Sequence, residues 1–174
     1  MHLQIASFAR DEIGLSYSSS VNLVIVLNGI GLPARIIPAY LGDRYVGVLN
    51  VFIISLVINI IMYWSWLGVD SIGSFYIFTV LYGLSSAAFQ SLFTPAITSL
   101  GNDITKTGTR IGMAFTVIGF SALVGGPISG ALVKADGGRY VAPTIWGAMS
   151  TVVGTAVMIT ARGLKHGWGW KTRC

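Results

Sequence analysis

The chain contains few charged residues, and the acidic ones are the scarcest. Asp, Glu, Lys and Arg together make up 10% of its 174 residues, with 6 acidic against 11 basic side chains. An ordinary soluble domain is about a quarter charged. Because so few charged groups cannot cover the surface of a soluble domain of this length, the composition excludes a soluble enzyme and a disordered chain.

Histidine and cysteine are also nearly absent. The two histidines are His2 and His166, and the single cysteine is the last residue, Cys174. One thiol cannot form an internal disulfide or a metal cluster. The long apolar runs contain no Asp, Glu or His, which are the groups that chemistry or proton pumping inside a membrane normally uses. We therefore expect no enzymatic activity, no metal and no cofactor.

What the chain has in abundance is apolar sequence. Hydrophobic residues make up 53% of it, and the mean hydropathy is +0.74. A membrane-spanning helix needs about 20 mostly apolar residues, and the apolar runs do not alternate as barrel strands do. We predict an all-α membrane protein in which residues 1–174 form one helical bundle with a tail at 162–174. The five expected spans are 20–41, 46–69, 72–100, 111–133 and 140–161.

The basic residues fall mainly on one side of this expected bundle. If successive loops alternate sides, eight of the eleven Lys and Arg residues share the side of the C-terminus. Because Lys and Arg accumulate on the cytoplasmic side, we expect a cytoplasmic C-terminus, and we favour the plasma membrane over an internal one. Charge distributed over loops in this way also argues against a nucleic acid partner.

The run 46–69 is rich in large side chains and has no small residues one turn apart. This profile predicts a helix that faces lipid, with Tyr63, Trp64 and Trp66 at the membrane interface. The alternative is that these aromatic side chains bind a substrate.

The run 111–133 is interrupted by small residues and by a proline. Gly126 and Gly130 have the spacing that lets two helix backbones approach closely. Pro127 removes a backbone hydrogen bond and bends a helix. Two compatible interpretations follow: the helix packs tightly against a neighbour, or it flexes as a gate.

The run 20–41 contains a charged residue, Arg35. A charge inside a membrane segment usually faces the bundle interior or a water-filled cavity, where a guanidinium group is suited to binding a carboxylate. Asn28 lies two helical turns earlier and could share its face, and Gln90 is a further polar candidate. The alternatives are that Arg35 extends to the cytoplasmic headgroups and that Gln90 makes an interhelical hydrogen bond.

The short loop after this run places Asp43 and Arg44 at a membrane surface. Asp43 could stabilise the N-terminal end of a neighbouring helix or pair with Arg110. The alternative is that the loop charges are simply solvated.

Three stretches, in this order and spacing, carry a resemblance to a known family. They read NGIGLPARIIPAYLGDR at 28–44, GTRIGMAF at 108–115 and GGPISGAL at 125–132. With them the chain resembles the C-terminal half of a major facilitator superfamily transporter, most closely the monocarboxylate-transporter-like branch common in fungi. The resemblance covers nearly the whole chain.

The resemblance implies that the five runs are helices eight to twelve of a twelve-helix fold, whose substrate site lies between two six-helix halves. It implies that Arg35 binds a substrate carboxylate, and that Asp43 and Arg44 form a cytoplasmic gate that braces the helix near Arg110. The monocarboxylate carriers have an aspartate one turn before the arginine that is linked to proton coupling. Gly31 takes that place here, which argues against proton coupling.

We therefore expect part of a secondary active transporter that moves a small organic solute, a monocarboxylate-like anion, by alternating access. Its expected partners are the lipid bilayer, the solute, and the missing N-terminal helices or another membrane subunit, without which the chain is not competent. The alternative is a non-transporting subunit or truncated remnant that associates through the glycine-rich helix. The expected gating residues are Asp43, Arg44, Arg110, Gly126, Pro127 and Gly130.

Overall fold

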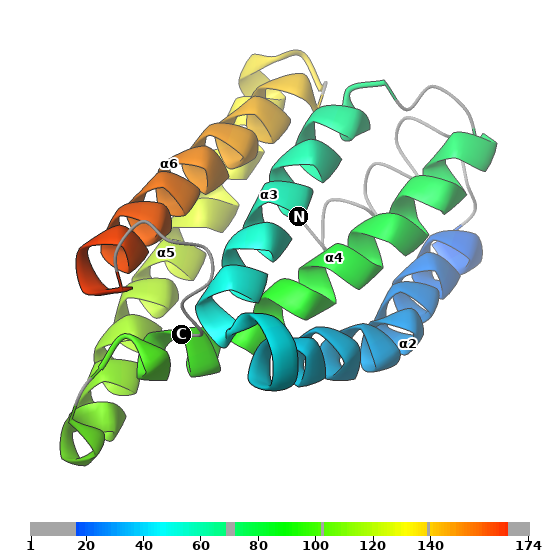
Figure 1. Cartoon of the computed structure of the whole chain (residues 1–174). Helices are drawn as coiled ribbons and strands as arrows, with labels where there is room; N and C mark the ends of the chain where they lie inside the picture. The colour runs from blue at the N-terminus through cyan, green and yellow to red at the C-terminus, as the bar shows by residue number, and fades with distance from the viewer. Residues whose placement is uncertain (1–16, 69–71, 102, 139, 167–174) are drawn as a thin grey trace.

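The computed structural model describes residues 17–68, 72–101, 103–138 and 140–166, and every element in these ranges is helical (Figure 1). The long helices are separated by two short ones, the π-helix η1 and the 3₁₀ helix η2. In chain order the elements are α2 (Tyr17–Leu41), η1 (Gly42–Val46), α3 (Val48–Trp66), α4 (Ile72–Ser99), η2 (Ile104–Lys106), α5 (Thr107–Ala135) and α6 (Val141–His166).

The prediction of an all-α membrane protein is confirmed. Among the described residues, four helices are long and apolar enough to cross a membrane: Val48–Trp66, Gly73–Ser99, Thr107–Ala135 and Val141–Lys165. In a bilayer each backbone polar group must be satisfied within the protein, and a continuous helix does this locally. The fifth expected span, 20–41, lies within α2, which continues through Pro33 and Pro38.

The helices pack in the spatial order α2, α4, α3, α6, with α5 lying behind α6 in the view of Figure 1. The main core lies between α3 and α4. It consists of Leu49, Phe52, Leu56, Leu92 and Ala96. Aromatic rings extend this core, because Phe52 stacks on Phe89 with a centroid distance of 5.4 Å.

The prediction that the segment 46–69 faces lipid is wrong for one side of the helix. α3 lies between α4 and α6 and buries residues along its length. Trp66, expected at the interface, is 5% exposed and packs edge-on against Phe75 and Phe78. Trp64 is exposed. A uniformly apolar helix has no polar face to reveal its orientation, because lipid and the protein interior are equally apolar.

Helix ends are set by glycines and one aspartate. Gly47 has a positive φ of 90° and links η1 to α3. Gly137 and Gly138 also have positive φ and end α5, where the Gly138 N–H donates to the Val133 carbonyl at 2.9 Å. This is a common use of glycine at a helix C-terminus. Asp136 then accepts a hydrogen bond from the Ala142 N–H in the first turn of α6, at 3.2 Å.

α5 differs from the other long helices in its burial. None of its described residues is buried. A side chain added at Gly126 or Gly130 would meet nothing within 4 Å. The tight packing expected of these glycines therefore does not occur within the described part of the chain.

Candidate functional site

A cavity of about 190 Å³ lies between α3, α4 and α6. The described residues that line it carry no charge and combine aromatic rings with hydroxyl and amide groups. They are Leu56, Asn59, Tyr63, Tyr82, Ser86, Phe89, Gln90 and Thr151. An apolar pocket with a few convergent polar groups is the usual form of a small-molecule site.

One wall of the cavity is fixed by a buried asparagine on α3. Asn59 is 7% exposed, and its side-chain amide donates hydrogen bonds to the carbonyls of Ser55 at 2.8 Å and Ser85 at 3.1 Å. The second bond joins α3 to α4. Polar bonds between helices stabilise membrane bundles because lipid offers no competing partner. Asn59 therefore fixes the separation of the two helices at the cavity.

A second wall is formed where α6 meets α3. The Tyr63 ring packs edge-on against Tyr82 of α4 with a centroid distance of 6.5 Å, and it lines the cavity together with Thr151 of α6. Gly147 allows α6 to approach this ring, because a Cβ at its position would lie 3.0 Å from Cε1 of Tyr63. Tyr63, expected at the membrane interface, therefore connects three helices at the cavity.

Gln90 is the one predicted substrate-contacting residue that the structure brings to this cavity. It lies two turns after Tyr82 and one turn after Ser86, so all three share one face of α4. Its side chain is exposed, and among the described residues no hydrogen bond to its amide is found. The amide is thus available to donate to and accept from a ligand.

Arg35 is not part of this cavity. Its side chain is exposed on α2. Asn28 belongs to the same helix, but its side chain lies outside the described residues. The structure therefore does not bring the three predicted substrate-binding residues into a single pocket.

Gly31 has a structural use where α2 crosses α4. A Cβ at this position would lie 3.3 Å from the Cβ of Ala87, closer than most side-chain contacts. Gly31 is buried, as is Ala34 one turn later. Small residues at such crossings let two backbones approach. Any side chain in place of Gly31 would require Ala87 to shift by a few tenths of an ångström.

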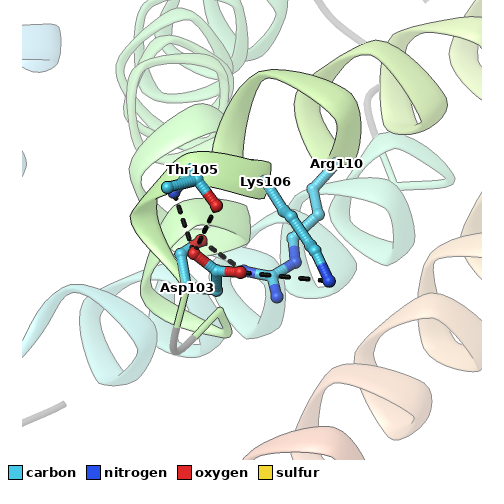
Figure 2. Close-up of polar contacts among 4 residues, drawn as sticks. All are labelled: Asp103, Thr105, Lys106 and Arg110. Carbon is cyan, nitrogen blue, oxygen red and sulfur yellow. Dashed lines mark hydrogen bonds and ion pairs between the residues drawn. The ribbon is translucent and has the colours of Figure 1, made fainter.

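The loop between α4 and α5 holds Arg110 through a cluster of polar contacts (Figure 2). The Arg110 guanidinium donates to the backbone carbonyl of Asp103 at 3.4 Å. The carboxylate of Asp103 accepts from the N–H and the hydroxyl of Thr105, at 3.0 and 2.6 Å. Nζ of Lys106 lies 3.9 Å from the same carboxylate. These contacts fold the arginine back onto its own loop.

The charge of Asp103 is stabilised by this arrangement. The hydroxyl group of Thr105 first, then its backbone N–H and the positive charge of Arg110, hold the pKa of Asp103 below its ordinary value of 3.8. Hydrogen bonds to a carboxylate favour its ionised form. The loop therefore keeps an anion beside the start of α5.

The two gating candidates in η1, Asp43 and Arg44, do not contact Arg110. Arg44 donates a hydrogen bond of 2.8 Å to the Tyr40 hydroxyl group, and its guanidinium carbon lies 5.8 Å from the centroid of that ring. Asp43 is exposed. In the described part of the chain Arg110 contacts Asp103 rather than Asp43.

The sequence did not reveal the polar residues at the end of α6. The tail predicted from residue 162 begins inside this helix, which runs to His166. Arg162 is 7% exposed and donates to the side-chain carbonyl of Asn50 on α3 at 2.5 Å. Lys165 donates to the carbonyl of Ser99, the last residue of α4, at 2.7 Å. The only available signal was the polarity of Asn50 within an apolar run.

The fold and the apolar helices define an integral, multi-pass, all-α membrane protein. Its sequence is similar to fungal transporters of the major facilitator superfamily (MFS). The chain is 38% identical over 160 residues to an MFS-type transporter of Gibberella zeae. The aligned region covers 91% of this chain and 36% of the relative. It is 31% identical over 163 residues to the riboflavin transporter MCH5 of Saccharomyces cerevisiae, covering 90% of this chain and 30% of the relative.

A third relative is the agnestins efflux protein AgnL12 of Paecilomyces divaricatus, which is 28% identical over 87% of this chain and 34% of its own length. The chain thus spans about a third of the length of these curated relatives. No protein-family model matches the chain. No solved structure matches it.

Proposed function

We propose that this chain is the C-terminal part of a secondary active MFS transporter that moves a small organic solute by alternating access. The observation that carries the proposal is the similarity to MFS-type transporters along about nine-tenths of the chain. Because the chain is much shorter than these relatives, the missing helices are its first partner. It acts in transport only together with them.

The first candidate substrate is a monocarboxylate-like anion bound by Arg35. A guanidinium group offers paired donors that match a carboxylate. Arg35 is exposed on α2 and therefore accessible to a ligand or to a second half of the transporter. Asn28 and Gln90 would add polar contacts. The gate would be formed by Asp43 and Arg44 with α5, whose glycines and Pro127 allow it to bend.

The test is uptake and efflux by the full-length protein, made with its upstream helices, carrying Arg35→Ala. Lys134→Ala removes one positive charge from an exposed residue of α5 and is the matched control. The expected result is loss of carboxylate transport in Arg35→Ala at unchanged expression, with normal transport in Lys134→Ala. Equal transport by both variants would remove Arg35 from the mechanism.

A second candidate substrate is a neutral heteroaromatic solute bound in the cavity between α3, α4 and α6. The observation that favours it is the uncharged lining, with ring faces from Tyr63, Tyr82 and Phe89 beside the amide of Gln90. One relative is named a riboflavin transporter. Riboflavin is therefore the probe to use: Gln90→Leu would abolish its transport and Arg35→Ala would not.

The rival class is a non-transporting membrane subunit that associates through the glycines of α5. The size of the native product separates it from the transporter. A tag at the chromosomal C-terminus would detect a band near 18.5 kDa if the short chain is the mature product. A band two to three times larger, on the order expected from the length of the relatives, would support the transporter.

A further inference from the structure

The last turns of α6 direct two cationic side chains toward the bundle. Arg162 is 7% exposed and donates through Nε to Oδ1 of Asn50 on α3. Lys165 donates to the Ser99 carbonyl at the end of α4. The second contact has a simple structural explanation, since a cation at a helix C-terminus pairs with its unsatisfied carbonyls. The contact between Arg162 and Asn50 has a further consequence, because Asn50 is itself hydrogen-bonded to another segment.

Asn50 continues the chain of hydrogen bonds from Arg162 to η1. It is 1% exposed, and its side-chain Nδ2 donates to the backbone carbonyl of Val46 at 2.8 Å. Val46 is the last residue of η1, the segment that also contains Asp43 and Arg44. Arg162 of α6 is thus joined to that segment through one buried side chain.

The orientation of the Asn50 amide follows from hydrogen-bond chemistry. A guanidinium group has only donors, whereas a side-chain amide has an acceptor at one end and donors at the other. Because Arg162 requires the acceptor, the donor end of Asn50 must face Val46. If the amide were flipped, its NH₂ group would face the guanidinium donors of Arg162, and its carbonyl oxygen would face the carbonyl oxygen of Val46. A buried group left unpaired in this way is costly.

We propose that Arg162 is a positioning residue for η1. Through Asn50 it holds the carbonyl of Val46, so that α6 and the segment containing Asp43 and Arg44 move as one unit. This inference rests on the proposed function only for the role of η1 as a gate. The mechanical link itself is independent of transport.

Three substitutions separate the parts of this link. Asn50→Asp keeps an acceptor for Arg162 but cannot donate to Val46. Arg162→Met removes the donor at the α6 end. Lys165→Met is the matched control, because it removes the other cationic contact of α6, which ends on Ser99 and does not reach η1.

The position of η1 can be measured by electron–electron distance spectroscopy between two spin labels. The full chain with Cys174→Ser, its only cysteine, would carry labels at Tyr45→Cys in η1 and Ile77→Cys in α4. Both native side chains are exposed, at 58% and 65%. Asn50→Asp and Arg162→Met are expected to shift or broaden the 45–77 distance distribution, and Lys165→Met is expected to leave it unchanged.

Transport by the full-length protein provides the second measurement. Asn50→Asp and Arg162→Met should lower turnover about tenfold, the size of effect found when residues along a coupled network are substituted, and KM is expected to change with it. An unchanged distance distribution in Asn50→Asp would overturn the link, whatever Arg162→Met does to folding. A changed distribution without any transport in the parent protein would support the link and contradict the proposed function.

Discussion

The guanidinium group of Arg110 lies over the α-carbon of Gly101, so that a methyl group added to this glycine would overlap Nη1 of the arginine. The same guanidinium donates to the carbonyl of Asp103. The absence of a side chain at residue 101 therefore makes room for the contact that folds Arg110 onto the loop between α4 and α5. Filling this space with a side chain tests how much the contact between Arg110 and Asp103 contributes to the stability of the protein.

Gly101→Ala is expected to displace Arg110 and to lower the stability of the protein by about 1 kcal/mol, the usual net contribution of one hydrogen bond. The flexible side chain can move away, so a larger loss is not expected. Gly108→Ala is the control, because its added methyl group meets nothing within 4 Å and alanine favours the helix. Thermal unfolding in detergent compares the two variants. Equal midpoints would contradict the role of Gly101.

Gly147→Ala is expected to disturb the joint between α6 and α3. The added Cβ would lie 3.0 Å from the Tyr63 ring, and overpacking of this kind costs about 1–3 kcal/mol. Gly154→Ala on the same helix is the control, since nothing lies within 4 Å of its added Cβ. The unfolding midpoint should fall in Gly147→Ala and hold or rise in Gly154→Ala. A drop of the same size in both would show that the Tyr63 contact is irrelevant.

Thr105→Val is expected to raise the pKa of Asp103 toward its ordinary value of 3.8, because the hydroxyl bond that lowers it most is lost. The folded pKa is depressed, so the charge of Asp103 favours folding above pH 3.8 and this contribution is lost as the pH falls through the lower folded value. Carboxyl ¹³C NMR can follow the residue, because the chain has only six acidic side chains. Thr109→Val, an exposed threonine in the first turn of α5, is the control and should leave the Asp103 titration unchanged.

Pro127→Ala is expected to raise thermal stability, because proline inside a helix is about 3 kcal/mol less favourable than alanine. If α5 must bend during transport, the same variant should lower turnover in the full-length protein. Pro143→Ala in the first turn of α6 is the comparison, since proline is tolerated there. Faster transport by a stabilised Pro127→Ala protein would rule out bending at this residue.

The sequence predicted the existence of the helices better than their packing. Apolar runs of sufficient length must be helical in a bilayer, so each of the five predicted runs corresponds to a helix of the structure to within a few residues. Four of these helices are long and apolar enough to cross a membrane. Which face of α3 is buried was not predictable, because Phe52 and Ile54 have similar polarity but opposite exposure. Only contacts with α4 and α6 distinguish them.

The candidate site was predicted in fragments. Gln90 stood out because it is polar within an apolar run, and it lines a cavity. Arg162 was assigned to the tail because a charged residue usually marks the end of a span. Its partner Asn50 is 112 residues away, and no local pattern in a sequence reports a pairing over that separation.

The exposure of α5 determines which of its positions tolerate substitution. Because none of its described residues is buried, a substitution scan of the chain alone would find nearly every position of this helix tolerant. A scan scored by the fitness of the organism would find intolerant positions only where some other surface covers the helix. The difference between the two scans would therefore trace the footprint of that surface on α5, residue by residue.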